Sequence, residues 1–293
     1  MAAKCSHWRR VGRALACLPL VVTAVTVAPI GQPEAGASIG TGTYDHANGF
    51  DTCANITNTG LDAWWNNTPW WHIGLYIGGA NGEANGCDPL SVSVFDYAVD
   101  VGFAVVPYFY GRQLPTSCGT APQSIYISLN TTTARAQGVS AADAANTAAL
   151  AYHLGGGGIL YLDLESGDNS STCLAAAKAF VGGWSEEINS YTSYWAGLYG
   201  STCGSKISDF SALQPSHPGY ISASDPGRQY SSVDGLLCLS DSLWTGYQRI
   251  HQFVYGRSLT YNGYHMIVDE DCAYSVMDTN HGDVSPHNCA LIT

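Results

Sequence analysis

Short apolar segments recur along this chain, and their number and spacing restrict its possible folds more than any other feature. Most of them are four to seven residues long and end in a polar or glycine-rich turn. Several are apolar throughout, which is typical of strands covered on both faces. The eight segments lie at residues 49–51, 73–77, 103–109, 159–164, 194–199, 219–223, 250–254 and 265–268.

Helical patterns lie between these segments. Ser140 and Asp143 have the spacing of a capping box and predict the start of an alanine-rich helix that ends at Gly155. Residues 173–188 predict a second helix, because their apolar side chains recur with the helical period. Eight strands alternating with helices over about 250 residues predict an α/β fold, a single TIM-barrel-like (β/α)8 domain, with a doubly wound sheet as the alternative.

The first 37 residues are predicted to be a signal peptide that is removed. Basic residues between Lys4 and Arg13 precede an apolar run at 14–30, and the small residues Ala35-Gly36-Ala37 suit a cleavage site. Export by the ordinary secretory route or, through Arg9-Arg10, by the twin-arginine route are both compatible with this pattern. We therefore expect a secreted or envelope-associated protein.

The remaining residues, 38–293, are predicted to form one domain with a short disulfide-tied tail from about residue 277. Removal of residues 1–37 takes away four basic residues and one acid, which moves the formal net charge from −12 to −15. Such a charge excludes nucleic acid or anionic lipid as a partner bound through bulk electrostatics. No second long apolar span follows, so we expect no membrane span in the mature protein, and we expect a monomer.

Eight cysteines remain after removal of the signal peptide, and an even number in an exported chain predicts disulfides. No pair has the Cys-x-x-Cys spacing of a zinc site, so no metal is expected there. The sequence allows 105 pairings; the simplest joins neighbours, such as Cys53–Cys87 and Cys272–Cys289. The eight are Cys53, Cys87, Cys118, Cys173, Cys203, Cys238, Cys272 and Cys289.

Two acids lie at the end of the segment "GGGGILYLDLESGDNSS" (155–171). Side chains two apart on a strand point to the same face, so Asp163 and Glu165 would both project into the mouth of a barrel. Carboxyls this close cannot both ionise freely, and one pKa is expected to be raised, as a general acid requires. The alternative is a solvated pair of acids that opens a loop.

Further acids follow the first and last predicted strands. Asp51 ends the first strand in "NGFDTC", and Asp269 and Asp271 end the last in "MIVDEDC". The first and last strands of a closed barrel are neighbours, so these acids are expected to meet. An oxygen-ligated metal site is an alternative use of them, but we expect no cofactor. Aromatic side chains near strand ends would stack on sugar rings; they include Tyr76, Tyr108, Tyr110 and Tyr199.

Several motifs in collinear order resemble one family. They are "GFDTC" (49–53), "HIGLYIGGANG" (72–82), "ARAQGVSAADAA" (134–145), "ILYLDLES" (159–166), "RIHQF" (249–253) and "VDEDCA" (268–273). The chain resembles, from residue 49 to 274, the glycoside-hydrolase-like domain of unknown function of secreted actinobacterial proteins, a distant relative of the family-25 lysozymes. The resemblance implies a TIM-barrel-like fold with a general acid at Glu165 and an assisting carboxylate at Asp163. It also implies acids at Asp51 and Asp269, and Gln252 and Asp271 join the candidate substrate contacts.

The chain departs from the family at two strands. Pro107-Tyr108-Phe109 stands where Pro-Ile-Tyr is usual, and Ser224 follows Ala223 where a tryptophan is frequent. Both changes affect the expected sugar-contacting wall and leave the acids in place.

Two function classes follow from the sequence. The first is a secreted glycosidase acting on cell-wall or related amino-sugar polysaccharide, in which Glu165 protonates the leaving oxygen. Asp163 would stabilise positive charge directly or orient a substrate acetamido group that attacks the anomeric carbon. The second is a glycan-binding or envelope-associated barrel without turnover.

Overall fold

A computed structural model describes residues 38–165, 167–168, 170–203, 207–225, 232–286 and 289. The predicted signal peptide at residues 1–37 lies outside the described residues, as does the end of the predicted tail beyond Cys289. Among the helices of the described residues, none combines the length and hydropathy that a membrane span requires.

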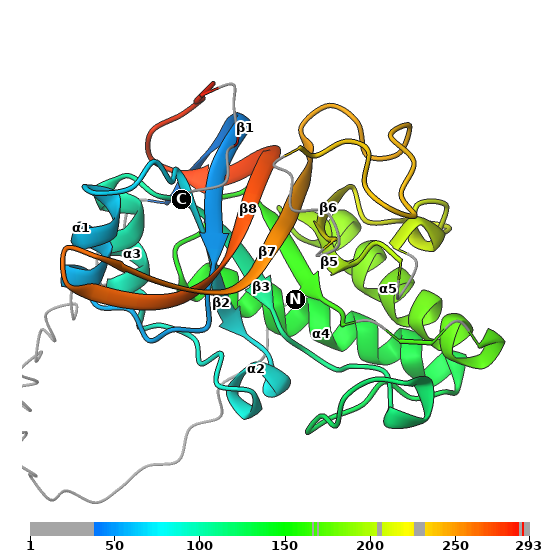
Figure 1. Cartoon of the computed structure of the whole chain (residues 1–293). Helices are drawn as coiled ribbons and strands as arrows, with labels where there is room; N and C mark the ends of the chain where they lie inside the picture. Colours follow the sequence, from blue (N-terminus) through cyan, green and yellow to red (C-terminus); the bar gives the residue numbers. More distant parts are fainter. Residues whose placement is uncertain are drawn as a thin grey trace, which may run out of the picture. The chain divides into compact units, whose positions relative to one another are not determined.

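Eight strands form a closed barrel in sequence order (Figure 1). Neighbouring strands from β1 to β7 are parallel, and β8 is antiparallel to both β7 and β1. The predicted barrel is confirmed, and closure excludes the doubly wound alternative. The strands are β1 (Gly40–Asp51), β2 (His72–Gly78), β3 (Ala104–Phe109), β4 (Ile159–Asp163), β5 (Trp195–Ser201), β6 (Tyr220–Ser224), β7 (Gln248–Tyr261) and β8 (Tyr264–Thr279).

The last strand runs opposite to the direction that the barrel prediction implied. Asn262 and Gly263 have φ of 47° and 78° and form a two-residue turn between β7 and β8. Such a turn joins antiparallel strands, whereas a parallel crossover needs a dozen residues or more. The expectation that Asp269 and Asp271 end the last strand is therefore wrong: β8 continues past both of them.

Helices follow each of the first four strands, and after β5 the described residues contain only a short 3-10 helix, η2 (Ile207–Phe210). The alternation of strand and helix thus holds for the first half of the barrel alone. The other helical elements are α1 (Asn58–Trp65), α2 (Ala80–Ala84), α3 (Val92–Val101), η1 (Thr116–Cys118), α4 (Thr131–Ala151) and α5 (Ser171–Tyr191).

The alanine-rich helix α4 begins nine residues before the predicted capping box. Asn130 caps it by accepting a hydrogen bond from the Thr133 N–H at 3.0 Å, and Ser140 lies inside it. The capping-box interpretation is wrong because alanine-rich sequence on both sides of Ser140 continues the helix. The apolar face predicted for α5 is confirmed, with Phe180, Val181 and Trp184 fully buried.

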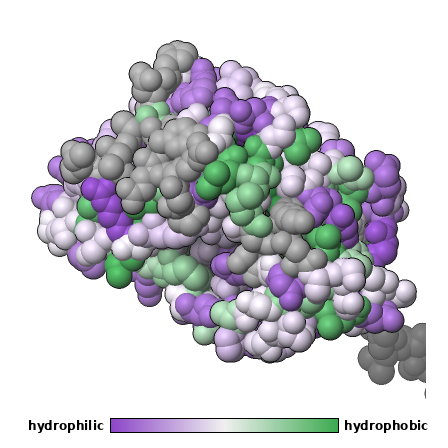
Figure 2. Space-filling view, turned by 45° about the vertical axis from the view of Figure 1, so that its right-hand side comes forward, coloured by the Kyte–Doolittle hydropathy of each residue, from purple (hydrophilic) through white to green (hydrophobic). Residues whose placement is uncertain are grey.

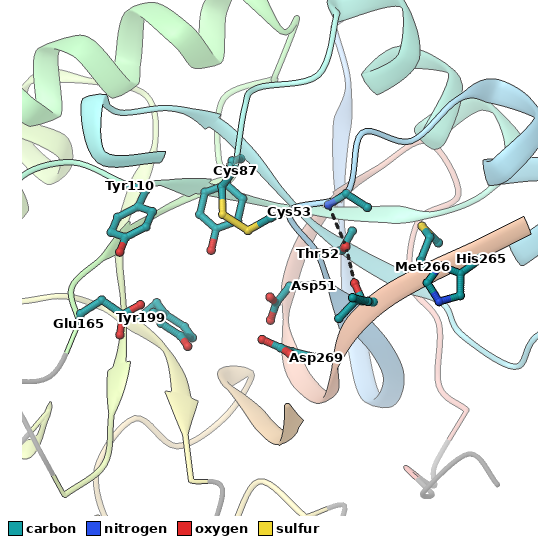
Figure 3. A pocket seen from close by; sticks show the side chains of 13 residues that line it. Asp51, Thr52, Cys53, Cys87, Tyr110, Glu165, Tyr199, His265, Met266 and Asp269 are labelled. Carbon is teal, nitrogen blue, oxygen red and sulfur yellow. Dashed lines mark hydrogen bonds between the residues drawn. A yellow bond between two sulfur atoms is a disulfide. The ribbon is translucent and has the colours of Figure 1, made fainter. Parts of the chain in front are cut away.

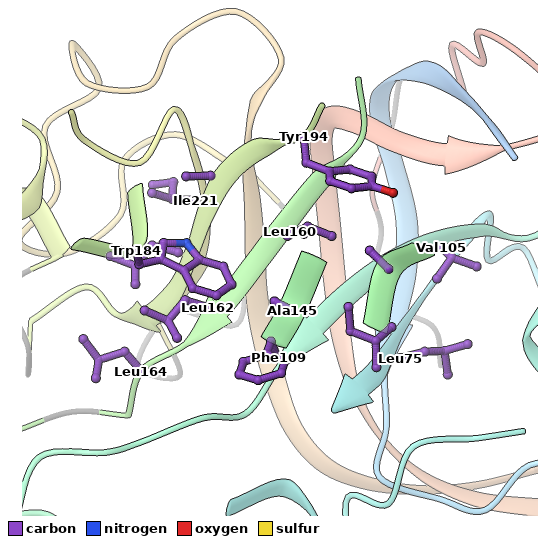
Figure 4. Close-up of a cluster of buried hydrophobic side chains, with 14 of the residues drawn as sticks. Leu75, Val105, Phe109, Ala145, Leu160, Leu162, Leu164, Trp184, Tyr194 and Ile221 are labelled. Atoms are coloured by element: carbon purple, nitrogen blue, oxygen red, sulfur yellow. The ribbon is translucent and has the colours of Figure 1, made fainter. Parts of the chain in front are cut away.

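Alternation along the central strands separates two buried layers. Leu160 and Leu162 of β4 face outward and pack with Trp184 of α5 and Ala145 of α4 (Figure 4). Tyr161, between the two leucines, belongs to a second cluster inside the barrel. The outward layer holds the helices on the sheet, and the same alternation directs Asp163 inward.

Four disulfides join cysteines that are neighbours in the sequence, as predicted: Cys53–Cys87, Cys118–Cys173, Cys203–Cys238 and Cys272–Cys289. On the face shown in Figure 2, hydrophilic and hydrophobic residues are intermingled.

Candidate active site

A pocket of about 590 Å³ opens where β1 and β4 end. Three carboxyl groups, three tyrosines, a disulfide and part of the β7–β8 hairpin line it (Figure 3). A concave site of this volume is of the size that small ligands occupy. The lining residues are Asp51, Thr52, Cys53, Ala54, Tyr76, Cys87, Tyr110, Glu165, Tyr199, His265, Met266, Ile267 and Asp269.

The two acids at the end of β4 differ in their access to the pocket. Glu165 is half-buried and lines it, whereas Asp163 is 1% exposed and does not. Gln113, which is 0% exposed, holds this segment: its Oε1 accepts from the Glu165 N–H and its Nε2 donates to the Asp163 carbonyl, both at 2.7 Å. Gln113 thereby holds the backbone on either side of Leu164, from which the Glu165 side chain extends.

Asp163 contacts the pocket through a tyrosine. The Tyr76 hydroxyl, from β2, donates to Asp163 Oδ2 at 3.1 Å. Burial, and then repulsion from Glu165, raises the pKa of Asp163 well above its usual value. Asp163 therefore acts on anything in the pocket by way of the Tyr76 side chain.

Asp51 and Asp269 lie in register on β1 and β8. Gln252 of β7 joins them, because its Nε2 lies 2.5 Å from Asp51 Oδ2 and 3.4 Å from Asp269 Oδ2. The Gly256 N–H donates to Asp269 Oδ1 at 2.6 Å. The predicted meeting of the acids of the first and last strands thus occurs in the middle of β8, not at its end.

The carboxyl groups in the pocket have raised pKa values. For Glu165 the pKa is raised by burial first and by repulsion from Asp269 second. Burial also raises the pKa of Asp269, although the bond from Gly256 lowers it. Figure 3 shows Glu165 on one side of the pocket, with Asp51 and Asp269 on the other.

The predicted tyrosines divide into two groups. Tyr76, Tyr110 and Tyr199 line the pocket, and the Tyr199 hydroxyl donates to Gln252 Oε1 at 2.9 Å. Tyr108 lies inside the barrel, where its hydroxyl is 2.9 Å from Ser222 Oγ. Tyr108, Gln252 and Asp271, the other predicted substrate contacts, are buried and do not line the pocket.

The β7–β8 hairpin forms a wall of the pocket that the strand and helix patterns did not predict. It reaches toward α1 (Figure 1), where Trp64 Nε1 donates to the Tyr264 carbonyl at 3.1 Å. Thr52 Oγ1 donates to the Ile267 carbonyl at 2.8 Å, which fixes the hairpin beside β1. Asn262-Gly263 between two apolar runs was the available signal.

Ser224, which stands where the family frequently has tryptophan, has its own aromatic neighbour. Its Oγ is hydrogen-bonded to the hydroxyl of Tyr255 on β7. Burial, and then repulsion from Asp269 and Glu165, raises the pKa of Tyr255. No sequence pattern singled out Tyr255, because it comes directly after the apolar segment 250–254, which predicts a core strand.

Among the described residues, one group of three potential metal ligands lies close together: Cys118, Asp168 and Cys173. Cys118 and Cys173 are joined in a disulfide and offer no thiolate. The carboxylates of the pocket do not bring three ligand atoms together at this spacing.

Comparison with known proteins gives one family and several structural neighbours. Residues 62–273 match the family model described as Rv2525c-like, glycoside hydrolase-like domain. An uncharacterized B. stearothermophilus protein matches with 14% identity and a TM-score of 0.50, over 78% of this chain and 95% of that chain. The Mycobacterium tuberculosis Tat-secreted protein Rv2525c, in complex with L-tartrate, matches with the same identity and TM-score, over 78% and 96%. 

A family GH25 lysozyme from Aspergillus fumigatus matches with 15% identity and a TM-score of 0.44, over 80% of this chain and 94% of that chain. No curated protein matches. At 14% identity, the two neighbours with a TM-score of 0.50 show a common fold and nothing finer.

Proposed function

Since this chain belongs to the Rv2525c-like, glycoside hydrolase-like family, we propose that it hydrolyses a glycosidic bond in an amino-sugar polysaccharide. Glu165 is the proton donor. The observation that carries the proposal is a half-buried glutamate at the pocket surface whose pKa is raised by burial and by a second carboxylate across the cavity. A general acid must keep its proton near the working pH, and this environment provides for that.

The partner of Glu165 faces it across the pocket. Glycosidases place their two carboxyl groups on opposite sides of the scissile bond. Here Glu165 lies on one side of the pocket, and Asp51 and Asp269 lie on the opposite side (Figure 3). We assign them the stabilisation of positive charge or the activation of water. Asp163, enclosed behind Tyr76, orients that tyrosine, and through it a substrate acetamido group if the reaction is substrate-assisted.

The test is turnover of purified cell-wall glycans by the wild type and by Glu165→Gln. Loss of general acid catalysis lowers turnover about 10²–10⁴-fold, while glycan affinity stays within a few-fold. Glu187→Gln, the same change on α5 outside the pocket, is the control and should leave turnover unchanged. Equal turnover by wild type and Glu165→Gln would refute the role of Glu165.

Glycan binding without turnover is the second candidate function. Tyr76, Tyr110 and Tyr199 in the pocket lining favour it, because aromatic rings can hold sugars with no chemistry. If wild type and Glu165→Gln bind the same glycan and neither cleaves it, the protein is a binder.

We also propose that the protein is exported and that its mature chain begins at Ser38. The four disulfides support an oxidising compartment. N-terminal sequencing of secreted material should find Ser38 or a residue beside it, and finding Met1 would contradict the proposal. Light scattering of the same material should give the mass of a monomer.

A further inference from the structure

A histidine and an aspartate lie buried behind the pocket, and the proposed reaction does not use them. His72 of β2 is 0% exposed and Asp271 of β8 is 1% exposed. His72 Nε2 lies 3.9 Å from Asp271 Oδ2, beyond hydrogen-bond length. Among the described residues, neither ring nitrogen of His72 has a hydrogen-bond partner. Burial of unpaired polar atoms costs free energy, so packing alone does not account for this histidine.

Two glycines make room for this arrangement. Asp271, Gly49 and His72 lie in register on β8, β1 and β2. A Cβ at Gly49 would lie 2.2 Å from ring atoms of His72, and a Cβ at Gly74 would lie 2.5 Å from the Cβ of Asp51. The inner faces of β1 and β2 are thus shaped around the imidazole and the carboxyl groups.

Asp271 also lies beside the pocket carboxyl Asp51 in the β1–β8 pairing, because Asp271 is paired with Gly49 and Asp269 with Asp51. Both carboxyls are buried, and two buried carboxylates on neighbouring strands cannot both ionise freely, so one of them retains a proton. Burial, and then repulsion from Asp51 and Asp269, raises the pKa of Asp271 well above its usual value. Burial lowers the pKa of His72 to about 3, so the imidazole is neutral and cannot neutralise either acid.

We propose that Asp51 and Asp271 share a single proton, and that neutral His72 is the donor that contacts Asp271 when that carboxyl ionises. The 3.9 Å gap then belongs to the protonated state of Asp271. Asp271 and His72 are positioning residues, and Asp51 carries the negative charge that faces the pocket. This array does not depend on the hydrolysis proposed above.

Other titratable groups face the pair from every side. Asp269 and Glu165 repel Asp51, and Glu270 repels Asp271. Tyr76, Tyr108 and Tyr199 stay neutral, because burial and the nearby acids raise their pKa values. The repulsion from Asp269 and Glu165 favours one retained proton over two ionised carboxylates, and Arg257 of β7 forms an ion pair with Glu270.

Carboxyl ¹³C NMR of aspartate-labelled protein tests the proposal, with Asp51→Asn identifying the signals. In the wild type, Asp51 and Asp271 should titrate in two steps separated by more than about one pH unit. Asp271→Asn keeps a neutral donor for Asp51, so the lower step should remain and the upper step should vanish. His72→Phe removes the donor to ionised Asp271 and should move the upper step upward by about 1–2 pH units, the equivalent of a hydrogen bond to a charged group.

Asp278→Asn, a change at another buried aspartate of β8, is the control and should leave both steps in place. Independent titration of Asp51 and Asp271 in the wild type overturns the shared proton, and that measurement needs no variant. If His72→Phe moves the upper step no more than Asp278→Asn does, the proposed role of His72 is overturned. His72→Gln replaces His72→Phe if the latter does not fold. None of these readouts is turnover, so they fail independently of the Glu165→Gln test.

Discussion

Replacement of Gln113 by leucine tests whether the segment that carries Glu165 depends on one side chain. Gln113 is 0% exposed, and its amide pairs with the Glu165 N–H and the buried Asp163 carbonyl, each at 2.7 Å. Leucine has a similar size but leaves both backbone groups unpaired. Each unsatisfied buried polar group costs about 1–3 kcal/mol, so we expect the free energy of unfolding to fall by about 2–6 kcal/mol.

Urea unfolding followed by tryptophan fluorescence measures this loss. Gln137→Leu is the matched control, because Gln137 also accepts from a backbone N–H, that of Ser128 at 2.8 Å, but is only half-buried. Its loss should cost about 0.5–1.5 kcal/mol, the net value of one ordinary hydrogen bond. If Gln113→Leu destabilises no more than Gln137→Leu, the proposed hold on the Asp163–Glu165 backbone is not important.

Three further outcomes are expected. Asp269→Asn removes the repulsion that helps to raise the pKa of the proposed proton donor, so the basic limb of the kcat/KM profile should move to lower pH; movement upward would contradict this. Burial raises the pKa of Asp278 well above its usual value of 3.8. The contribution of this group to stability is therefore present at low pH and is lost as the pH rises through the raised pKa. In urea unfolding, Asp278→Asn should raise the free energy of unfolding, relative to wild type, more at pH 8 than at pH 4. Gly49→Ala places a Cβ 2.2 Å from the His72 ring and should cost about 1–3 kcal/mol by overpacking, whereas Gly219→Ala, whose Cβ meets only one atom at 4.0 Å, should be nearly neutral in thermal unfolding.

The barrel and its disulfides were predictable because local patterns encode them. Continuous apolar runs such as 159–164 mark strands covered on both faces, and helices between them leave few ways to arrange a sheet. Asp163 and Glu165 were identified as candidates because the two-residue period of a strand puts both on one face. Disulfides between sequence neighbours follow from chain proximity, and all four obey it.

The sequence prediction failed where a short local pattern was interpreted without the residues on either side of it. Ser140 and Asp143 have the spacing of a helix start, yet they lie inside α4 because the alanine-rich sequence before them is equally helical. The residues before Gly49 are mostly glycine and polar residues and do not predict a strand, although β1 begins at Gly40, where it pairs with β8.

The sequence by itself determined the kind of chain this is: a barrel of short buried strands, cross-linked by neighbouring cysteines, with candidate acids on its first, fourth and last strands. Only the tertiary structure decided which of those acids reach the pocket. Asp163 is enclosed behind Tyr76, while Asp269 reaches the pocket from mid-strand because β8 runs antiparallel to β1. The physical reason is that periodicity fixes the face on which a side chain lies, whereas its depth depends on strand register and on the side chains that other strands place around it.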